Sequence, residues 1–218
     1  TPNNKILSMK FFTKQLLLAF ILISVNLVSG QEGDESSENK FDFAQDDHYL
    51  NIKIGGDYVQ PMGNTFTGDN LKSSGGFNLE LSFNLFETPI LLGARFSNSS
   101  HDVIDQSLVG NYDETFNSFI GGFAGYQFFS RQKIRLTPSI GIGHVTYRQS
   151  INSNSFRDSG TTFWVNAEVS YNFVKWFVLY GNVTLQNDYL KMDVPAELED
   201  YFKSGHFVRF GLGVKFVL

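Results

Sequence analysis

The chain has 218 residues, no cysteine, and 17 Lys and Arg against 22 Asp and Glu. Without cysteine there is no disulfide framework and no thiolate metal site. The net charge of −5 argues against nucleic acid as a partner, because phosphate binding needs a basic surface.

The first thirty residues predict a secretory signal peptide. Lys10 and Lys14 form a basic start, residues 16–23 are apolar, and small residues precede the expected cleavage. The uncharged stretch is short for a spanning helix, although a retained N-terminal anchor stays an alternative. Met9 is the expected start of translation. Residues 1–30 are therefore assigned to the signal peptide.

Residues 31–47 predict an acidic, disordered leader, since they carry seven acidic residues and one lysine. Removal of residues 1–30 takes away three lysines and no acid, which leaves 14 basic against 22 acidic side chains, a balance of −8. Residues 48–218 then form one domain.

Eight segments of about ten residues in this domain carry apolar side chains at every second position, the pattern of strands. In chain order the assigned apolar faces are Leu50, Ile52, Ile54 and Tyr58; Phe77, Leu79, Leu81, Phe83 and Leu85; Ile90, Leu92, Ala94 and Phe96; Ile134, Leu136, Ile140 and Ile142; Phe163, Val165, Ala167, Val169, Tyr171 and Phe173; Phe177, Leu179, Val183 and Leu185; Phe210, Leu212, Val214, Phe216 and Leu218. The fourth segment, residues 116–128, is rich in Gly and Phe on both faces, so its phase stays open.

Short and long connections alternate between these segments. The short ones are residues 86–89, 129–133 and 174–176, and the long polar ones are residues 60–74, 98–114, 149–160 and 187–205. Short periplasmic turns and long outer loops are typical of outer-membrane barrels of Gram-negative bacteria. The pattern predicts an all-β fold, an eight-stranded antiparallel up-and-down transmembrane β-barrel.

The phase of the strands favours apolar side chains outside and charges inside. A slip of one residue exchanges the two faces of a strand. Arg95, Arg209 and Lys215 would then face lipid, at about 2–4 kcal/mol each near the midplane. A soluble, lipocalin-like barrel with its apolar faces inward is the alternative.

A salt bridge is predicted in the lumen. A two-residue turn at Glu87 and Thr88 places Glu80 opposite Arg95 on the inner face. Further charges predicted for this lumen ion network are Lys53, Glu168 and Arg209. An eight-stranded barrel is only just wide enough for side chains. We expect the charges to neutralise one another and plug the lumen; the alternative is a path for solutes or protons.

Aromatic residues cluster where the two membrane interfaces are expected, and such girdles need no cofactor to explain them. At the short turns they are Phe86, Phe128, Phe129, Phe173, Trp176 and Phe177. Near the long loops they are Tyr58, Tyr147, Phe163, Tyr189 and Phe207.

No cofactor or metal site is predicted. The four histidines lie on separate elements, and the acidic residues of the long loops show no regular ligand spacing, so solvated loop charge is favoured over Ca²⁺ or other cations. His144 and Thr146 are expected to face outward two residues apart. The pair resembles the His and nearby Ser of some lipid A deacylases that are eight-stranded barrels, with Thr where a Ser nucleophile would be expected. Asp158 is the only candidate acidic partner, which leaves a lipid A-modifying hydrolase as a remote alternative.

The last strand carries Arg209, Gly211, Val214 and Phe216 at a spacing that resembles the C-terminal assembly signal of outer-membrane barrels. With this pattern the chain resembles small barrels of the OmpA-transmembrane-like and OmpX-like type, and most closely the "porin family" of Bacteroidota. It departs from them in ending on two residues after Phe216. The resemblance implies residence in the cell outer membrane, contact with outer-membrane lipid and lipopolysaccharide, and insertion by the barrel assembly machinery.

We expect a non-enzymatic structural, adhesive or accessory membrane protein that acts through its extracellular loops, with a possible protein partner at the loops or the lipid face. The alternative is a narrow channel for small solutes or ions. Fold alone does not set function.

Overall fold

The computed structural model describes residues 50–86, 88–104, 114–151, 154–191 and 197–218. The predicted signal peptide and leader, and Glu87 of the predicted turn, lie outside these residues. None of the helices within them combines the length and the apolar character that a membrane crossing requires.

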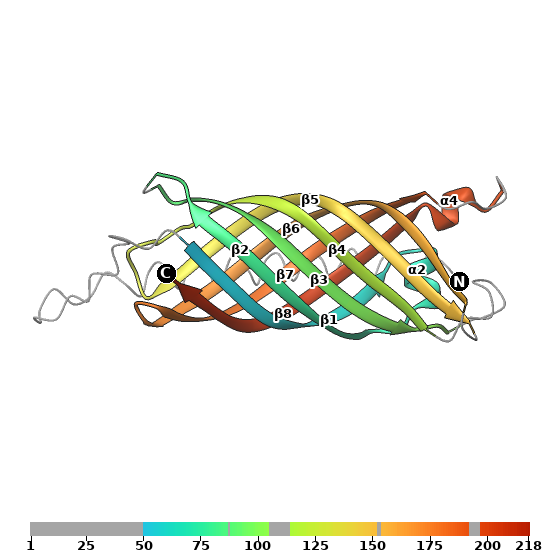
Figure 1. Ribbon diagram of the computed structural model, residues 1–218, viewed down its shortest axis with the longest axis horizontal. Helices are drawn as coiled ribbons and strands as arrows, with labels where there is room; N and C mark the ends of the chain where they lie inside the picture. The colour runs from blue at the N-terminus through green and yellow to red at the C-terminus, as the bar shows by residue number, and fades with distance from the viewer. Residues whose placement is uncertain (1–49, 87, 105–113, 152–153, 192–196) are drawn as a thin grey trace, which may run out of the picture. The chain divides into compact units, whose positions relative to one another are not determined.

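Eight antiparallel strands form a closed barrel in these described residues, each strand pairing with its neighbours in sequence and β1 closing on β8 (Figure 1). The strands are β1 (Leu50–Met62), β2 (Ser74–Asn84), β3 (Ile90–Asp102), β4 (Glu114–Tyr126), β5 (Ile134–Ile151), β6 (Asn154–Val174), β7 (Phe177–Lys191) and β8 (Ser204–Val217). Two short helices, α2 (Phe66–Asn70) and α4 (Glu199–Phe202), lie at the end where the long connections gather. The predicted fold class is confirmed.

The two faces of the sheet are oriented as predicted. Leu81 and Leu212 are 50% and 74% exposed, whereas Glu80 and Glu168 are 4% and 1% exposed. The apolar faces predicted for these strands therefore lie on the outside, and the charged faces line the lumen. A continuous apolar exterior around a charged interior is the arrangement of a barrel that spans a bilayer.

The packing of its phenylalanines decides the phase of β4, which the sequence pattern left undecided. Phe119 and Phe123 are buried in the lumen, while Phe116 and Ile120 are exposed on the outside. Phe123 fits inside because its ring lies over Gly93 of β3, where a Cβ atom would collide with it.

Most strands are longer than the ten residues expected, and the predicted loop 149–160 is wrong. β5 has 18 residues and β6 has 21, and they remain paired up to Ile151 and Asn154. The apolar alternation stops where lipid stops, but backbone hydrogen bonds between polar strands continue beyond it. The β5–β6 hairpin thus extends past the last residues that β4 and β7 pair with, Gln149 and Ser159.

Tyr147 and Phe207 do not belong to the outer aromatic girdle. Both are buried inside the barrel, at 0% and 1% exposed. Each shares the face of a residue that points inward on the same strand, Tyr147 that of Val145 and Phe207 that of Arg209. The phase of the strand decides the direction of an aromatic side chain, and its distance from a loop does not.

Because the chain has no cysteine, single cysteines can test the orientation of the faces. We expect Leu212→Cys to react with a lipid-soluble maleimide in vesicles, since Leu212 points to lipid. Ser97→Cys, at a lumen position that is 0% exposed, should react only after unfolding in urea. Labelling is read by mass spectrometry, and the opposite pattern would mean an inverted barrel.

Candidate functional site in the barrel lumen

One cluster of buried ions occupies the part of the lumen nearer the short turns. Glu168 accepts hydrogen bonds from Lys53 and Lys215, each at 2.6 Å. Lys53 also forms an ion pair with Glu80, whose other oxygen lies 3.0 Å from Nε of Arg95. Buried charges are tolerated when they are paired and hydrogen-bonded. This cluster joins two acidic and three basic side chains into one chain of contacts.

The register of the sheet explains why these residues meet. Lys215, Lys53, Glu80 and Arg95 lie opposite one another on β8, β1, β2 and β3, so they form one row along the inner wall. The two lysines are direct cross-strand neighbours, an unfavourable pair of like charges. Glu168 reaches them from β6, across the lumen, and supplies the opposite charge.

Arg209 lies in a second cluster, nearer the long connections. Its Nη1 is 3.6 Å from Oδ2 of Asp57, and its Nε donates to Gln186 at 2.6 Å. Gln186 in turn donates to Asp188 at 2.8 Å, and Asp188 accepts a second hydrogen bond, at 2.7 Å, from the hydroxyl of Tyr147. The Asp57 carboxylate thus lies beside Arg209 of β8. The Asp188 carboxylate is bound by Gln186 of its own strand and by Tyr147 of β5.

The structure places four predicted network residues, Lys53, Glu80, Arg95 and Glu168, in the first cluster and Arg209 in the second. The prediction omitted Lys215, Asp57 and Asp188. Lys215 and Asp57 lie on inward faces that the sequence pattern identifies. Asp188 stood within a connection expected to be a loop, although it belongs to β7.

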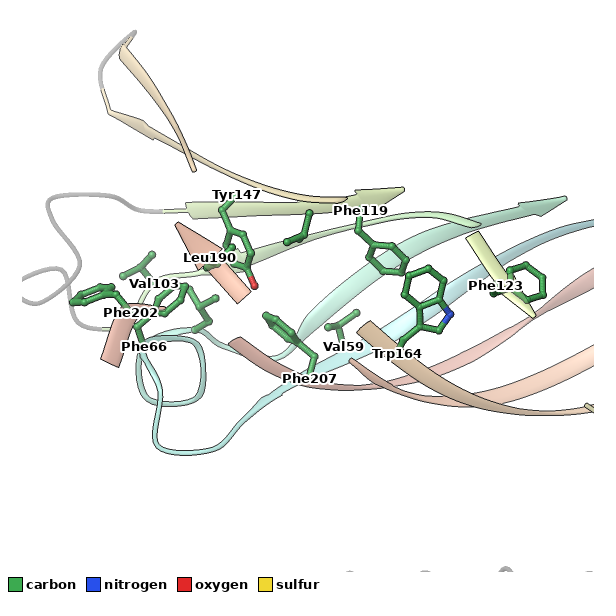
Figure 2. Close-up of a cluster of buried hydrophobic side chains, with 12 residues drawn as sticks. Val59, Phe66, Val103, Phe119, Phe123, Tyr147, Trp164, Leu190, Phe202 and Phe207 are labelled. Carbon is green, nitrogen blue, oxygen red and sulfur yellow. The ribbon is translucent and has the colours of Figure 1, made fainter. Parts of the chain in front are cut away.

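A hydrophobic cluster extends along the lumen from the long-connection end past the second ion cluster, where the Arg209 guanidinium lies 5.3 Å from the centre of the Phe119 ring (Figure 2). Its larger members come from four strands and from the two helices. They are Phe66, Phe119, Phe123, Tyr147, Trp164, Phe202 and Phe207. Phe119 and Trp164 pack with ring centroids 5.1 Å apart, and Phe66 stacks on Phe202 at 5.5 Å. The mouth of the barrel at the long connections is therefore closed by aromatic rings.

The connection between β1 and β2, residues 63–73, forms the outermost part of this closure, and we call it the plug loop. It carries α2, whose Phe66 is fully buried. Asn70 donates to the Tyr201 hydroxyl at 2.8 Å, and its backbone oxygen accepts from Ile104 at 2.7 Å. Phe66 and Leu71 were the sequence signal for this role, as two large apolar residues in a polar connection.

On α4, the helix beside the plug loop, the Asp200 carboxylate accepts a hydrogen bond from the Lys203 ammonium group. That hydrogen bond lowers the pKa of Asp200 and raises the pKa of Lys203. Both side chains are exposed, so this pair carries little stability.

The pattern considered for a hydrolase does not assemble around Asp158. His144 and Thr146 lie on the outer side of β5 as expected, but Asp158 pairs with Tyr147 and follows the inner phase of β6. Within the described residues, no group of three or more His, Cys, Asp or Glu side chains is placed to hold a metal ion.

The four residues of the C-terminal pattern divide between the two faces of β8. Arg209 and Gly211 share the inward phase of the strand, and Val214 and Phe216 the outward phase. Phe216 stacks on Trp176 with ring centroids 6.4 Å apart, at the short-turn end.

No family model matches the chain, and no curated protein matches its sequence. Among solved structures, Neisserial surface protein A matches with a TM-score of 0.60 and 8% identity, over 78% of this chain and 97% of that one. The outer membrane protein OprG from Pseudomonas aeruginosa matches with a TM-score of 0.58 and 11% identity, over 78% and 96%. Ail, the attachment invasion locus protein of Yersinia pestis, matches with a TM-score of 0.52 and 17% identity, over 79% and 99%. At these identities the likeness is one of fold.

Proposed function

We propose that the protein is an integral outer-membrane barrel with a sealed lumen, acting as a structural, adhesive or accessory component through its long connections. The observation that carries this proposal is the filling of the lumen. Paired ions occupy one part, and the plug loop with its aromatic cluster closes the other. A barrel so filled offers solutes no open path.

The long-connection end supplies the surface for recognition. Binding residues of proteins often lie on loops that a rigid scaffold holds in place. Here the scaffold is the closed sheet, and among the described residues the β5–β6 hairpin extends past the last residues that β4 and β7 pair with. The structure of Ail was solved in complex with the heparin analogue sucrose octasulfate. We infer that a sulfated saccharide is a class of ligand to test against the long connections of this chain.

Biogenesis is part of the proposal. A signal peptide over residues 1–30 would deliver the chain to the periplasm, and the barrel assembly machinery would recognise Arg209, Gly211, Val214 and Phe216 in β8. The same C-terminal pattern supports membership of the "porin family" barrels of Bacteroidota. We do not propose an enzymatic activity. If purified membranes deacylated lipid A and the His144→Ala variant lost that activity, the protein would be an enzyme after all.

A narrow channel is the second candidate, favoured by polar atoms in the lumen. Among the described residues, Asn117 Oδ1, Thr162 Oγ1 and Arg209 Nη2 are buried without a hydrogen-bond partner. Buried polar groups need partners, and water in a lumen provides them.

Conductance in planar bilayers distinguishes the two functions. We expect the wild-type protein to give no stepwise current. The double variant Phe66→Ala and Phe202→Ala removes the stacked rings at the mouth of the barrel and should also give no steps, because the paired ions still fill the rest of the lumen. Phe86→Ala is the matched control, since Phe86 is 86% exposed at the short-turn end. Steps from the wild type, altered by Glu80→Ala or Arg95→Ala, would favour the channel.

A further inference from the structure

Two arginines lie directly opposite each other on the outside of the β5–β6 hairpin. Arg148 pairs with Arg157 across the two strands, and both side chains are exposed. Like charges in directly opposed positions destabilise a sheet. A bound anion between the two guanidinium groups would remove this repulsion.

A third cation extends the pair toward β7. Lys191 lies opposite Ser159 and is exposed, and Ser159 also lies opposite Thr146. Arg157 and Lys191 are thus diagonal neighbours on the outer face. We call Arg148, Arg157 and Lys191 the outer cationic cluster.

Acidic side chains of the described residues do not neutralise this cluster. Among the ion pairs within those residues, none includes Arg148, Arg157 or Lys191. On β4 the neighbour of Arg148 is Phe116, and Glu114 accepts a hydrogen bond from Ser100.

The distance of the outer cationic cluster from the apolar band indicates which kind of anion it can bind. Below it, Ile142, Phe163 and Tyr189 are exposed on the same three strands and mark the apolar band. Arg148 follows Ile142 by six residues, so at roughly 3.3 Å per residue and a tilt of about 40° it lies about 15 Å further out. This is the layer of lipid headgroups above the hydrocarbon.

We propose that the outer cationic cluster binds the phosphate groups of lipopolysaccharide in the outer leaflet and holds one such lipid against β5, β6 and β7. Guanidinium groups bind phosphate with paired hydrogen bonds, and the hydroxyls of Thr146 and Ser159 add neutral donors beside them. Tyr189 and Phe163, whose rings pack at 6.0 Å, lie below, where acyl chains begin. The inference rests on the proposed residence in the outer membrane.

The test uses the full chain in nanodiscs of phosphatidylcholine with a small fraction of bisphosphorylated lipid A, and native mass spectrometry counts the lipids retained. We expect the wild type to retain lipid A selectively. Arg148→Gln with Arg157→Gln should weaken its retention about thirtyfold, at about 1 kcal/mol for each cation near a membrane surface. Arg131→Gln with Lys133→Gln, exposed cations at the short turns, should leave retention unchanged.

The Arg157→Glu variant distinguishes a loss of lipid A binding from a loss of barrel stability. A glutamate opposite Arg148 replaces repulsion with attraction, so the barrel should unfold at higher urea concentration while retaining less lipid A. Equal retention by wild type and double variant, or equal loss in the short-turn control, would overturn the inference. So would retention of dephosphorylated lipid A, or binding of a soluble sulfated polysaccharide but not of lipid A. Recovery of the protein outside the outer-membrane fraction would instead overturn the proposed function.

Discussion

Replacing Glu168 with alanine is expected to lower the free energy of unfolding by about 3–5 kcal/mol, the cost of breaking a buried ion pair by removing one partner. Glu168 is 1% exposed and accepts hydrogen bonds from both Lys53 and Lys215. Its loss leaves Lys215 without a described counter-ion beside Lys53. Urea unfolding in detergent, followed by circular dichroism, measures the change.

Removal of the second charge should restore much of this loss. In the double variant Glu168→Gln with Lys215→Met, Lys53 keeps its ion pair with Glu80, and no charge of β8 is left unpaired in the cluster. We expect it to be more stable than Glu168→Ala by at least 1 kcal/mol, since apolar replacement of buried ion pairs is often neutral. Equal instability of both variants would mean that an unpaired Lys215 is not the cause of the loss.

Trp164→Ala is expected to cost about 3–5 kcal/mol of unfolding free energy, the range for large aromatic residues removed from a packed core. The indole lies in the lumen on Gly141, where a Cβ atom would overlap it, and packs against Phe119. Its removal leaves a cavity between β4 and β6 that the closed sheet cannot collapse to fill. The same urea titration measures the loss.

The chain offers a matched control in its second tryptophan. Trp176 is 57% exposed at the short-turn end, so Trp176→Ala should cost about 1 kcal/mol or less. Each variant keeps one tryptophan, and quenching by brominated lipid should affect Trp176 but not Trp164. Similar losses from both substitutions would argue against a packed lumen.

The sequence predicts the wall of the barrel well because lipid imposes a strict period of two. A strand that crosses a bilayer cannot place Arg95 or Glu168 outside without a large cost, so the face of each residue follows from its neighbours. The register between β2 and β3 could also be predicted, because counting back from the short turn places Glu80 opposite Arg95.

The packing of large side chains inside the lumen was harder to predict because no such period governs it. Phe119 and Phe123 face inward against the expectation that large apolar residues face lipid, and only their packing on Trp164 and Gly93 explains them. The plug loop depends on contacts with Tyr201 and Ile104, which are distant in sequence. The extension of β5 and β6 lies outside the membrane, where the apolar pattern ends.

The direct opposition of Lys53 and Lys215 has a consequence for the order in which the protein folds. These residues lie on the first and last strands, at the seam where the cylinder is sealed. If β1 met β8 early, two ammonium groups would be brought together with no carboxylate of β6 beside them. Lys53 already has Glu80 of β2 as a counter-ion, whereas Lys215 gains one only when Glu168 is in position. We therefore expect closure of the seam to be most favourable after the sixth strand has joined the sheet.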